Sequence, residues 1–276
     1  MKIELAESYG FCFGVKRAIK IAEANRNSAT YGPLIHNPNE IDRLKRDFNV
    51  ALAENLDTFI KGDTAVIRTH GIPKDELKTL QERGVGVIDA TCPYVTKPQQ
   101  IVEQMSEDGY DIVIFGNSNH PEIKGVKSYA STNVYVVNSS DELDGLKLRD
   151  RVATVAQTTR KIEDYHSIVS ALMRRSKEVR VFNTICNATF DNQDAARDLA
   201  KRADVMIVIG GKSSSNTKQL YSICADYCSD SYHIEDKNEL DSNWFVGKKH
   251  CGISAGASTP DWIIQEVIKS IETMSS

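Results

Sequence analysis

Three of the six cysteines occupy the same kind of place in the sequence. Cys12, Cys92 and Cys186 each stand directly before a helical pattern, and they lie 80 and 94 residues apart. One such cysteine is more often a small buried apolar residue than a ligand. Three equivalent ones predict thiolates that converge on one metal centre. They suit a [4Fe–4S] cluster with one iron left open, whereas zinc would normally need a fourth ligand or an open catalytic position.

Each cysteine is followed by two further turns that carry polar side chains. These candidate ligand-binding residues are His36 and His70 after Cys12, His120, Glu122 and Thr158 after Cys92, and Ser214, Ser215, Asn216 and Ser258 after Cys186. Five of the seven prolines come one to three residues after one of these polar residues or cysteines. Because proline is favoured in the first turn of a helix, these side chains are predicted at helix N-termini, where anions bind.

Two of these motifs also have a purely structural interpretation. Asn37 and Glu40 have the spacing of a helix N-cap and its capping-box partner, which leaves His36 unexplained. Asn119 and Glu122 have the same spacing. In the functional interpretation Glu122 is instead a proton donor and the neighbouring histidine contacts the ligand. The local sequence does not decide between the two.

The run "GGKSSSN" at 210–216 resembles a phosphate-binding P-loop. That motif needs a glycine where Met206 stands, so a triphosphate site of this type is not predicted. A turn rich in hydroxyl and amide groups can still bind a diphosphate through neutral donors.

The remaining cysteines are predicted to be packing residues. Cys224 and Cys228 share one face of a helical pattern, and Cys251 falls in a strand-like run. A second metal site is the alternative, but buried packing is the better interpretation.

Strand-like and helical patterns alternate along the whole chain. The Val- and Ile-rich runs are 64–69, 110–116, 134–137, 151–157, 179–185, 204–210 and 250–256. Short apolar strands separated by amphipathic helices indicate parallel sheets covered by helices. Together with the cysteine repeat, this predicts an α/β fold of three similar small units with mostly parallel sheets, arranged with pseudo-threefold symmetry around a central cavity.

Composition limits the class of protein. The chain has 276 residues, of which 41% are apolar and 26% charged, as in ordinary globular proteins. The net charge of −4 without a basic block argues against a nucleic-acid partner. No signal-peptide pattern or apolar run of about 18 residues is present, so we expect a cytoplasmic protein without a membrane partner. Cysteines there are not expected to form disulfides.

The motifs, taken together, resemble those of one family. The chain closely resembles the LytB or IspH family of 4-hydroxy-3-methylbut-2-enyl diphosphate reductases over essentially its whole length. The motifs, all in the family's order, are "GFCFGVKRA", "GPLIHNP", "RTHGIP", "DATCPYVTK", "HPEIKG", "AQTT", "TICNAT", "SSSNTKQL" and "GISAGASTPDWII".

The resemblance implies a role for each candidate residue. Cys12, Cys92 and Cys186 match the ligands of one [4Fe–4S] cluster with an open iron site. The diphosphate-binding positions match His36, His70, Ser214, Ser215, Asn216 and Ser258. His120 matches a substrate contact, Glu122 the proton-relay acid, and Thr158 its hydroxyl partner near the substrate alcohol.

The resemblance also implies the reaction and the domains. The family reduces its allylic diphosphate substrate by two electrons and removes the hydroxyl group, giving isopentenyl and dimethylallyl diphosphate in the last step of the methylerythritol phosphate pathway to isoprenoids. The implied electron donor is a reduced ferredoxin or flavodoxin. The implied units around the central iron–sulfur cluster are 13–92, 93–182, and 183–276 together with the N-terminal strand region 1–12.

Two other classes of function stay open. A dehydratase or condensing enzyme of the quinolinate synthase type also takes three cysteines from three similar units, but it predicts a dicarboxylate pocket. The His, Ser and Asn set fits a diphosphate better. A redox- or oxygen-sensing binding protein predicts cluster loss without turnover, and gives no reason for Glu122 and Thr158.

Overall fold

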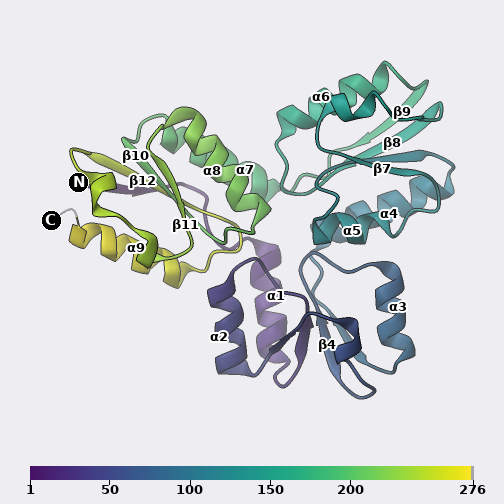
Figure 1. Cartoon of the computed structure of the whole chain (residues 1–276), viewed down its shortest axis with the longest axis horizontal. Coiled ribbons are helices and arrows are strands. Elements are labelled where there is room, and N and C mark those ends of the chain that lie inside the picture. The colour runs from purple at the N-terminus through teal and green to yellow at the C-terminus, as the bar shows by residue number, and fades with distance from the viewer. Residues whose placement is uncertain (275–276) are drawn as a thin grey trace. The chain divides into compact units, whose positions relative to one another are not determined.

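The computed structural model describes residues 1–274 and contains three four-stranded sheets in which every strand pairing is parallel (Figure 1). Helices separate the strands along the chain, as βαβ connections require. The predicted fold class, an α/β fold of three similar units, is confirmed.

The first sheet has the strand order β3-β2-β4-β5. Its strands are β2 (Ala29–Tyr31), β3 (Ala51–Ala53), β4 (Thr64–Ile67) and β5 (Gly86–Asp89), and the helices in this stretch are α1 (Phe13–Ala24), α2 (Pro38–Phe48) and α3 (Lys74–Glu82). Leu80 of α3 is fully buried against Ala65 and Ile67 of β4. The apolar face of α3 is therefore what covers this side of the sheet.

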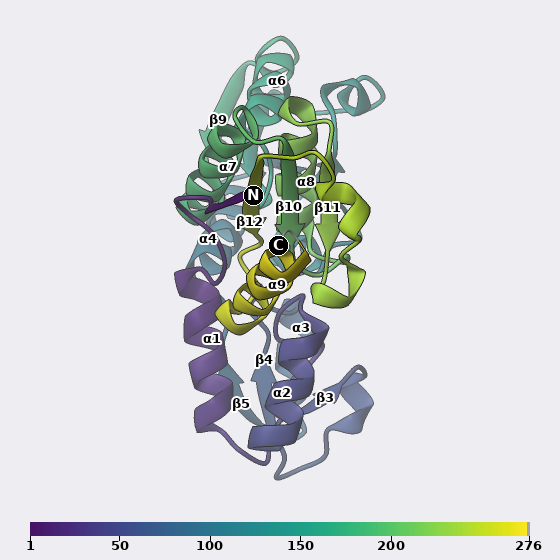
Figure 2. The ribbon, with the colours of Figure 1, turned by 90° about the vertical axis from the view of Figure 1, so that its left-hand side faces the viewer.

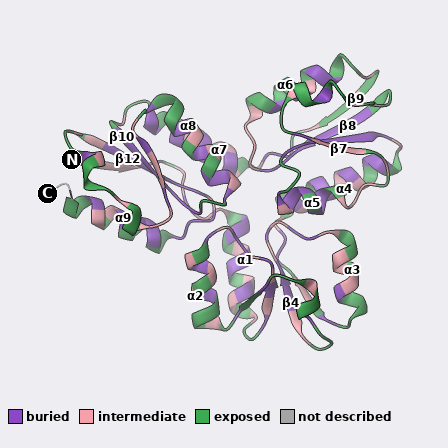
Figure 3. Ribbon diagram, in the orientation of Figure 1, coloured by how far each residue is buried: buried purple, intermediate pink, exposed green. Residues whose placement is uncertain are grey.

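The second sheet has the order β7-β6-β8-β9. Its strands are β6 (Asp111–Phe115), β7 (Val134–Val137), β8 (Arg151–Ala156) and β9 (Glu178–Phe182), with helices α4 (Pro93–Glu107), α5 (Pro121–Lys127) and α6 (Ile162–Met173). Every residue of β6 is buried, and so is all of the neighbouring strand β8 after its first residue (Figure 3), as expected for central parallel strands covered on both faces.

The third sheet has the order β1-β12-β10-β11, so the first strand of the chain pairs with the last. Its strands are β1 (Lys2–Leu5), β10 (Val205–Ile209), β11 (Ser231–Ile234) and β12 (His250–Ala255), with helices α7 (Asn187–Ala200), α8 (Ser215–Tyr227) and α9 (Asp261–Met274). Helix α9 packs on one face of this sheet (Figure 2), and α7 and α8 pack on the other. Short 3-10 turns span Leu56–Thr58, Ser140–Leu143, Lys237–Glu239 and Ser242–Phe245.

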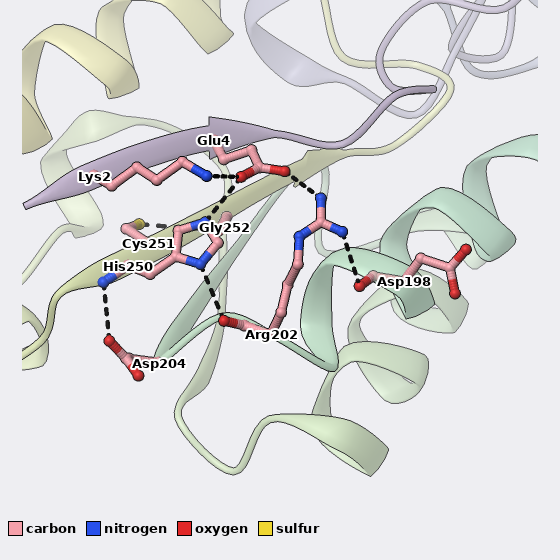
Figure 4. Close-up of polar contacts among 8 residues, drawn as sticks. All are labelled: Lys2, Glu4, Asp198, Arg202, Asp204, His250, Cys251 and Gly252. Atoms are coloured by element: carbon pink, nitrogen blue, oxygen red, sulfur yellow. Dashed lines mark hydrogen bonds and ion pairs between the residues drawn. The ribbon is translucent and has the colours of Figure 1, made fainter.

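A polar network also holds β1 to its neighbour β12 (Figure 4). The Glu4 carboxylate pairs with Arg202 and lies 3.1 Å from the imidazole Nε2 of His250. Asp204 accepts hydrogen bonds from the backbone N–H groups of Lys249 and His250, both at 2.9 Å. The segment that leads to Cys12 therefore starts from a firmly anchored strand.

The chain divides into two compact bodies. The central body comprises residues 17–34 and 44–186 and holds the first and second sheets. The C-terminal body comprises residues 1–16, 35–43 and those from 187 onward, and holds the third sheet. The division into units 13–92, 93–182 and 183–276 with 1–12 stays a prediction, and its residues 275–276 lie outside the described residues. Among residues 1–274, no helix has both the length and the apolar character needed to cross a bilayer.

Candidate functional site

The three predicted ligand cysteines occupy equivalent turns, and we call Cys12, Cys92 and Cys186 the strand-end cysteines. Each follows an edge strand of its sheet (β1, β5 and β9) and immediately precedes a helix (α1, α4 and α7). Cys92 is the N-cap residue of α4, with Pro93 in the first turn behind it. All three are half-buried thiols. Their side chains therefore stand beside the N-termini of α1, α4 and α7.

One backbone hydrogen bond recurs at all three turns. The N–H of Cys12 donates to the Ala257 carbonyl (3.3 Å), that of Cys92 to Thr69 (3.0 Å), and that of Cys186 to Thr158 (3.0 Å). Each of these carbonyls lies two residues beyond the end of the inner strand next to the edge strand: β12, β4 and β8 respectively.

These bonds fix each cysteine against a turn that carries a candidate ligand-binding residue. Ala257 precedes Ser258, Thr69 precedes His70, and Thr158 is itself a candidate. The repeat predicted from spacing is thus present as a repeated local geometry.

The central body joins Glu122 to Thr158. Glu122 lies in the first turn of α5 and is 1% exposed. Its Oε1 accepts from the Thr158 N–H at 2.8 Å, and its Oε2 accepts from the Thr158 hydroxyl at 2.7 Å. Burial raises the pKa of Glu122 to about 7, although the two Thr158 bonds and the nearby Arg160 oppose the rise. A carboxyl group with such a pKa can donate a proton at neutral pH.

His120 is the N-cap of α5, so the structural alternative in which Asn119 caps this helix does not hold. The imidazole Nδ1 of His120 accepts from the Glu122 N–H at 3.2 Å, and Pro121 fills the first helical position. In the neutral ring the proton therefore resides on Nε2, which can donate to a ligand. The side-chain carbonyl of Asn117, in turn, accepts from the N–H of Asn119.

His70 lies against the same helix entry. Its ring centroid is 5.3 Å from that of His120, with the rings nearly perpendicular. Gly71 has φ of +70°, and a Cβ there would approach Gln99 Nε2 to 2.8 Å, so the turn after His70 needs glycine. The central body thus brings His70, His120, Glu122 and Thr158 together with the two cysteine turns of Cys92 and Cys186.

The C-terminal body carries the hydroxyl and amide residues at one helix entry. Ser214 is the N-cap of α8, and its hydroxyl oxygen accepts from the Thr217 N–H at 3.3 Å, while Ser215 is the first helical residue. Asn216 is 5% exposed, and within residues 1–274 neither Oδ1 nor Nδ2 of its amide has a hydrogen-bond partner. A buried amide in this state costs free energy, which a bound polar ligand offsets.

His36 and Ser258 meet at the same end of this sheet. The Ser258 hydroxyl donates to the His36 carbonyl at 3.3 Å, and a Cβ on Gly211 would come within 2.3 Å of that oxygen. Asn37 caps α2, because its Oδ1 accepts from the Glu40 N–H at 3.1 Å. The Glu40 side chain pairs with Arg43 and Trp262. Asn37 is therefore structural, as its spacing indicated.

One residue near this loop was not expected from the sequence. His233 of β11 donates from Nε2 to the Gly210 carbonyl at 2.8 Å, and its burial lowers the pKa of the imidazole. Lys212 is turned outward, with its ammonium bound to the His233 carbonyl and, at 2.9 Å, to Glu239. The loop therefore presents neutral groups rather than its lysine. Nothing in "SYHI" marks His233, since its role depends on pairing with β10.

The cysteine environments decide which thiols suit a metal cluster. Cys224, Cys228 and Cys251, which we call the core cysteines, are buried in the apolar interior around the third sheet. Burial raises the pKa of Cys224 and of Cys251 to about 12. Iron–sulfur clusters need accessible thiolates. The strand-end cysteines fit that requirement, whereas the core cysteines are packing residues, as predicted.

The chain is similar to proteins of one family along its whole length. The family model "LytB protein" matches residues 3–272. A Sulfurimonas denitrificans protein named "4-hydroxy-3-methylbut-2-enyl diphosphate reductase" is 68% identical over 272 residues, which is 99% of each chain. A Campylobacter concisus protein of the same name is 63% identical over 272 residues and the same coverage.

Two solved structures agree with this. One, titled as (E)-4-hydroxy-3-methyl-but-2-enyl diphosphate reductase, the terminal enzyme of the non-mevalonate pathway, is 43% identical with a TM-score of 0.72, and the match covers 99% of this chain and 100% of that one. The E-1-hydroxy-2-methyl-but-2-enyl-4-diphosphate reductase of Plasmodium falciparum is 26% identical with a TM-score of 0.92, and the match covers 99% and 88%. The chain therefore belongs to the LytB protein family.

Proposed function

We propose that the chain is a 4-hydroxy-3-methylbut-2-enyl diphosphate reductase that forms isopentenyl and dimethylallyl diphosphate, the last step of the methylerythritol phosphate pathway. The names of relatives that are similar over the full length support this activity. Among the contacts, the one that carries the proposal is the buried Glu122–Thr158 pair, because the reaction needs an acid beside the leaving hydroxyl.

The reaction breaks one C–O bond and forms one C–H bond. Two electrons and two protons enter, and the substrate hydroxyl leaves as water. Hydroxide is a poor leaving group, so Glu122 supplies its proton to the departing oxygen. The Thr158 hydroxyl, which shares a hydrogen bond with that carboxyl at 2.7 Å, orients the acid and can contact the substrate alcohol. Protonation of either end of the allylic system then gives the two isomers.

We further propose that Cys12, Cys92 and Cys186 are the ligands of one [4Fe–4S] cluster with an open iron site. Family membership supports an iron–sulfur cluster, and the three equivalent half-buried thiols support this ligand set. When bound, such a cluster supplies electrons and a Lewis-acidic iron. The reduced electron donor, a ferredoxin or flavodoxin, and a cytoplasmic location are proposals that rest on the family resemblance.

The diphosphate group is proposed to bind His36, His70, Ser214, Ser215, Asn216 and Ser258, with His120 as a further substrate contact. The unsatisfied Asn216 amide and the N-terminus of α8 support this assignment, since both suit an anion. Neutral donors bind an anion strongly only when water is excluded. The quinolinate synthase alternative predicts a dicarboxylate substrate. The relatives are instead named for a diphosphate substrate, which favours the reductase.

Purification without oxygen, followed by iron and sulfide analysis and an assay with a reduced one-electron donor, tests the proposal. We expect both isomeric products. Glu122→Gln should slow turnover by about 10²- to 10⁴-fold, the usual worth of a general acid, without loss of iron. Glu103→Gln is the matched control, because that half-exposed helix carboxylate pairs only with Lys74 among the ion pairs of the described residues.

Two results would contradict the proposal. A protein with a full complement of iron that forms neither isomer is not this reductase. Glu122→Gln turnover equal to that of Glu103→Gln would remove the acid from its assigned role.

A further inference from the structure

Hydrogen bonds connect the ends of β8 and β9 beyond the last residues that pair as strands. The last paired residues are Val155 and Phe182. One residue further along β8, both backbone groups of Ala156 are taken by a side chain: the Thr184 hydroxyl accepts from the Ala156 N–H at 2.9 Å and donates to the Ala156 carbonyl at 2.5 Å. Thr184 is 8% exposed, so water does not replace it.

Two residues further along, a second hydrogen bond connects the same two segments. There the Cys186 N–H donates to the Thr158 carbonyl at 3.0 Å. The remaining polar atoms of Thr158, its N–H and its hydroxyl, bind the two carboxyl oxygens of Glu122. Glu122, Thr158 and Cys186 are thus connected by consecutive hydrogen bonds. We call the two hydrogen bonds between Thr184 and Ala156 the Thr184 clasp, and it lies two residues before Thr158 and Cys186.

We propose that Thr184 is a positioning residue that holds Cys186 and the Glu122–Thr158 pair at a fixed separation. This inference rests on the proposed function, in which Cys186 binds the cluster and Glu122 is the acid. The clasp sets the register of the two turns, so the acid is aligned with the cysteine before substrate arrives. A clasp of this kind couples the cluster turn to the acid: loosening either turn loosens the other.

The competing explanation is that Thr184 only satisfies two buried backbone groups. Thr184→Val removes the hydroxyl at nearly constant volume, and Thr184→Ser keeps it. Thr154→Val is the matched control. It removes a fully buried hydroxyl on β8 that accepts from the Tyr165 hydroxyl at 3.5 Å.

The first measurement is the infrared carboxyl band of Glu122, assigned by its loss in Glu122→Gln and followed against pH. The Thr158 bonds lower the pKa of this carboxyl, so weakening them in Thr184→Val should raise that pKa by about one unit, a tenfold change in its protonation equilibrium. Thr184→Ser and Thr154→Val should match the wild type. An unchanged Glu122 titration in a folded Thr184→Val protein, whatever its melting temperature, overturns the proposal.

The second measurement uses only the wild-type protein, so it decides the matter if Thr184→Val does not fold. Amide hydrogen exchange of residues 154–160 and 183–187 is compared with and without the cluster. Coupling predicts that cluster binding slows both segments, by about tenfold or more. Protection confined to 183–187 overturns it. Neither measurement needs turnover. A protein that shows the coupling between the two turns but is inactive would count against the proposed function alone. An active protein without that coupling would count against this inference alone.

Discussion

The strand-end cysteines and the core cysteines are the same residue type in opposite surroundings. The strand-end set lies half-buried at turns before helices, each tied by its N–H to a neighbouring turn. The core set lies inside the third sheet's apolar packing, where Cys251 and Cys224 are fully buried. Burial, with a smaller contribution from the neighbouring Cys228, raises the pKa of Cys224 and of Cys251 to about 12. The difference teaches that placement at the end of a strand, rather than the presence of cysteine, decides which thiols are accessible enough to suit a metal cluster.

The largest effect expected from this contrast is on cluster binding. Cys186→Ser should abolish it, because a serine alkoxide is a far weaker iron ligand than a thiolate. Cys251→Ala should keep the full iron content, since that thiol lies in the apolar packing around the third sheet, where it donates to the Gly252 carbonyl at 3.9 Å. Iron and sulfide analysis of both variants, purified without oxygen, measures this. Equal iron content in the two proteins would erase the distinction between the sets.

Burial should lower the thiol reactivity of Cys224 and Cys251 by about a thousandfold. The pKa of Cys224 and of Cys251 is raised to about 12 from an ordinary value of 9.0, so at pH 8 their thiolate fraction falls by about 10³. In the cluster-free protein, iodoacetamide should label the half-buried strand-end cysteines within minutes, but Cys224 and Cys251 only after unfolding, as read by peptide mass spectrometry. Fast labelling of Cys251 in folded protein would show that its burial is overstated.

Glu122 combines features of both cysteine sets. It is buried like the core cysteines, but it binds Thr158, whose carbonyl accepts from the N–H of the strand-end residue Cys186. Its pKa is about 7 in the folded protein and 4.5 as the ordinary value. Between these pH values the folded state keeps a proton that the unfolded state has released. The carboxyl's contribution to the free energy of unfolding is therefore fully present below pH 4.5 and is lost as pH rises through 7.

The Glu122→Gln variant isolates that contribution. Relative to the variant, cluster-free wild type should lose about 2–3 kcal/mol of unfolding free energy between about pH 5 and pH 8. Denaturant titrations at the two pH values measure it, and other titrating groups cancel in the difference. A constant offset between the two proteins would mean that the carboxyl is hydrated rather than buried.

The smallest expected effect is on packing in the core set. Cys224 packs in the hydrophobic core with Leu199, Met206 and Leu220. Cys224→Ala removes its buried sulfur and should lower the free energy of unfolding by about 1–2 kcal/mol. Thermal unfolding of the cluster-free variant measures it, at about 2–4 °C per kcal/mol. Cys224→Val, which refills the space, should recover part of the loss. Stability equal to wild type in Cys224→Ala would indicate a loosely packed site.

Much of the fold was predictable because its strongest signals are local. All seven Val- and Ile-rich runs contain strands. The strands that were not predicted, β2, β3 and β11, read "ATY", "ALA" and "SYHI". They are short and contain no run of Val and Ile, so pairing decides that they are strands: β3 pairs with β2, β2 with β4, and β11 with β10.

The candidate site was predictable where spacing reflects geometry. The cysteine repeat predicted three equivalent turns, and the structure contains them. The position of Pro121 predicted His120 at a helix N-terminus, and His120 is the cap of α5, just as Asn37 and Cys92 precede a first-turn proline. The roles of Arg160 and His233 could not be predicted, because both depend on which buried groups the fold places beside them.

The pairing of β1 with β12 has a consequence for how the protein is made. Cys12 receives its backbone anchor from Ala257, which leaves the ribosome 245 residues later. At about 5–20 residues per second, the first cysteine to be synthesised waits roughly 10–50 s before the strand that fixes its turn exists. Cys92 and Cys186 can be set earlier, because Thr69 and Thr158 precede them in the chain. In the proposed cluster, the Cys12 turn is therefore the last of the three to be completed, because it needs residue 257.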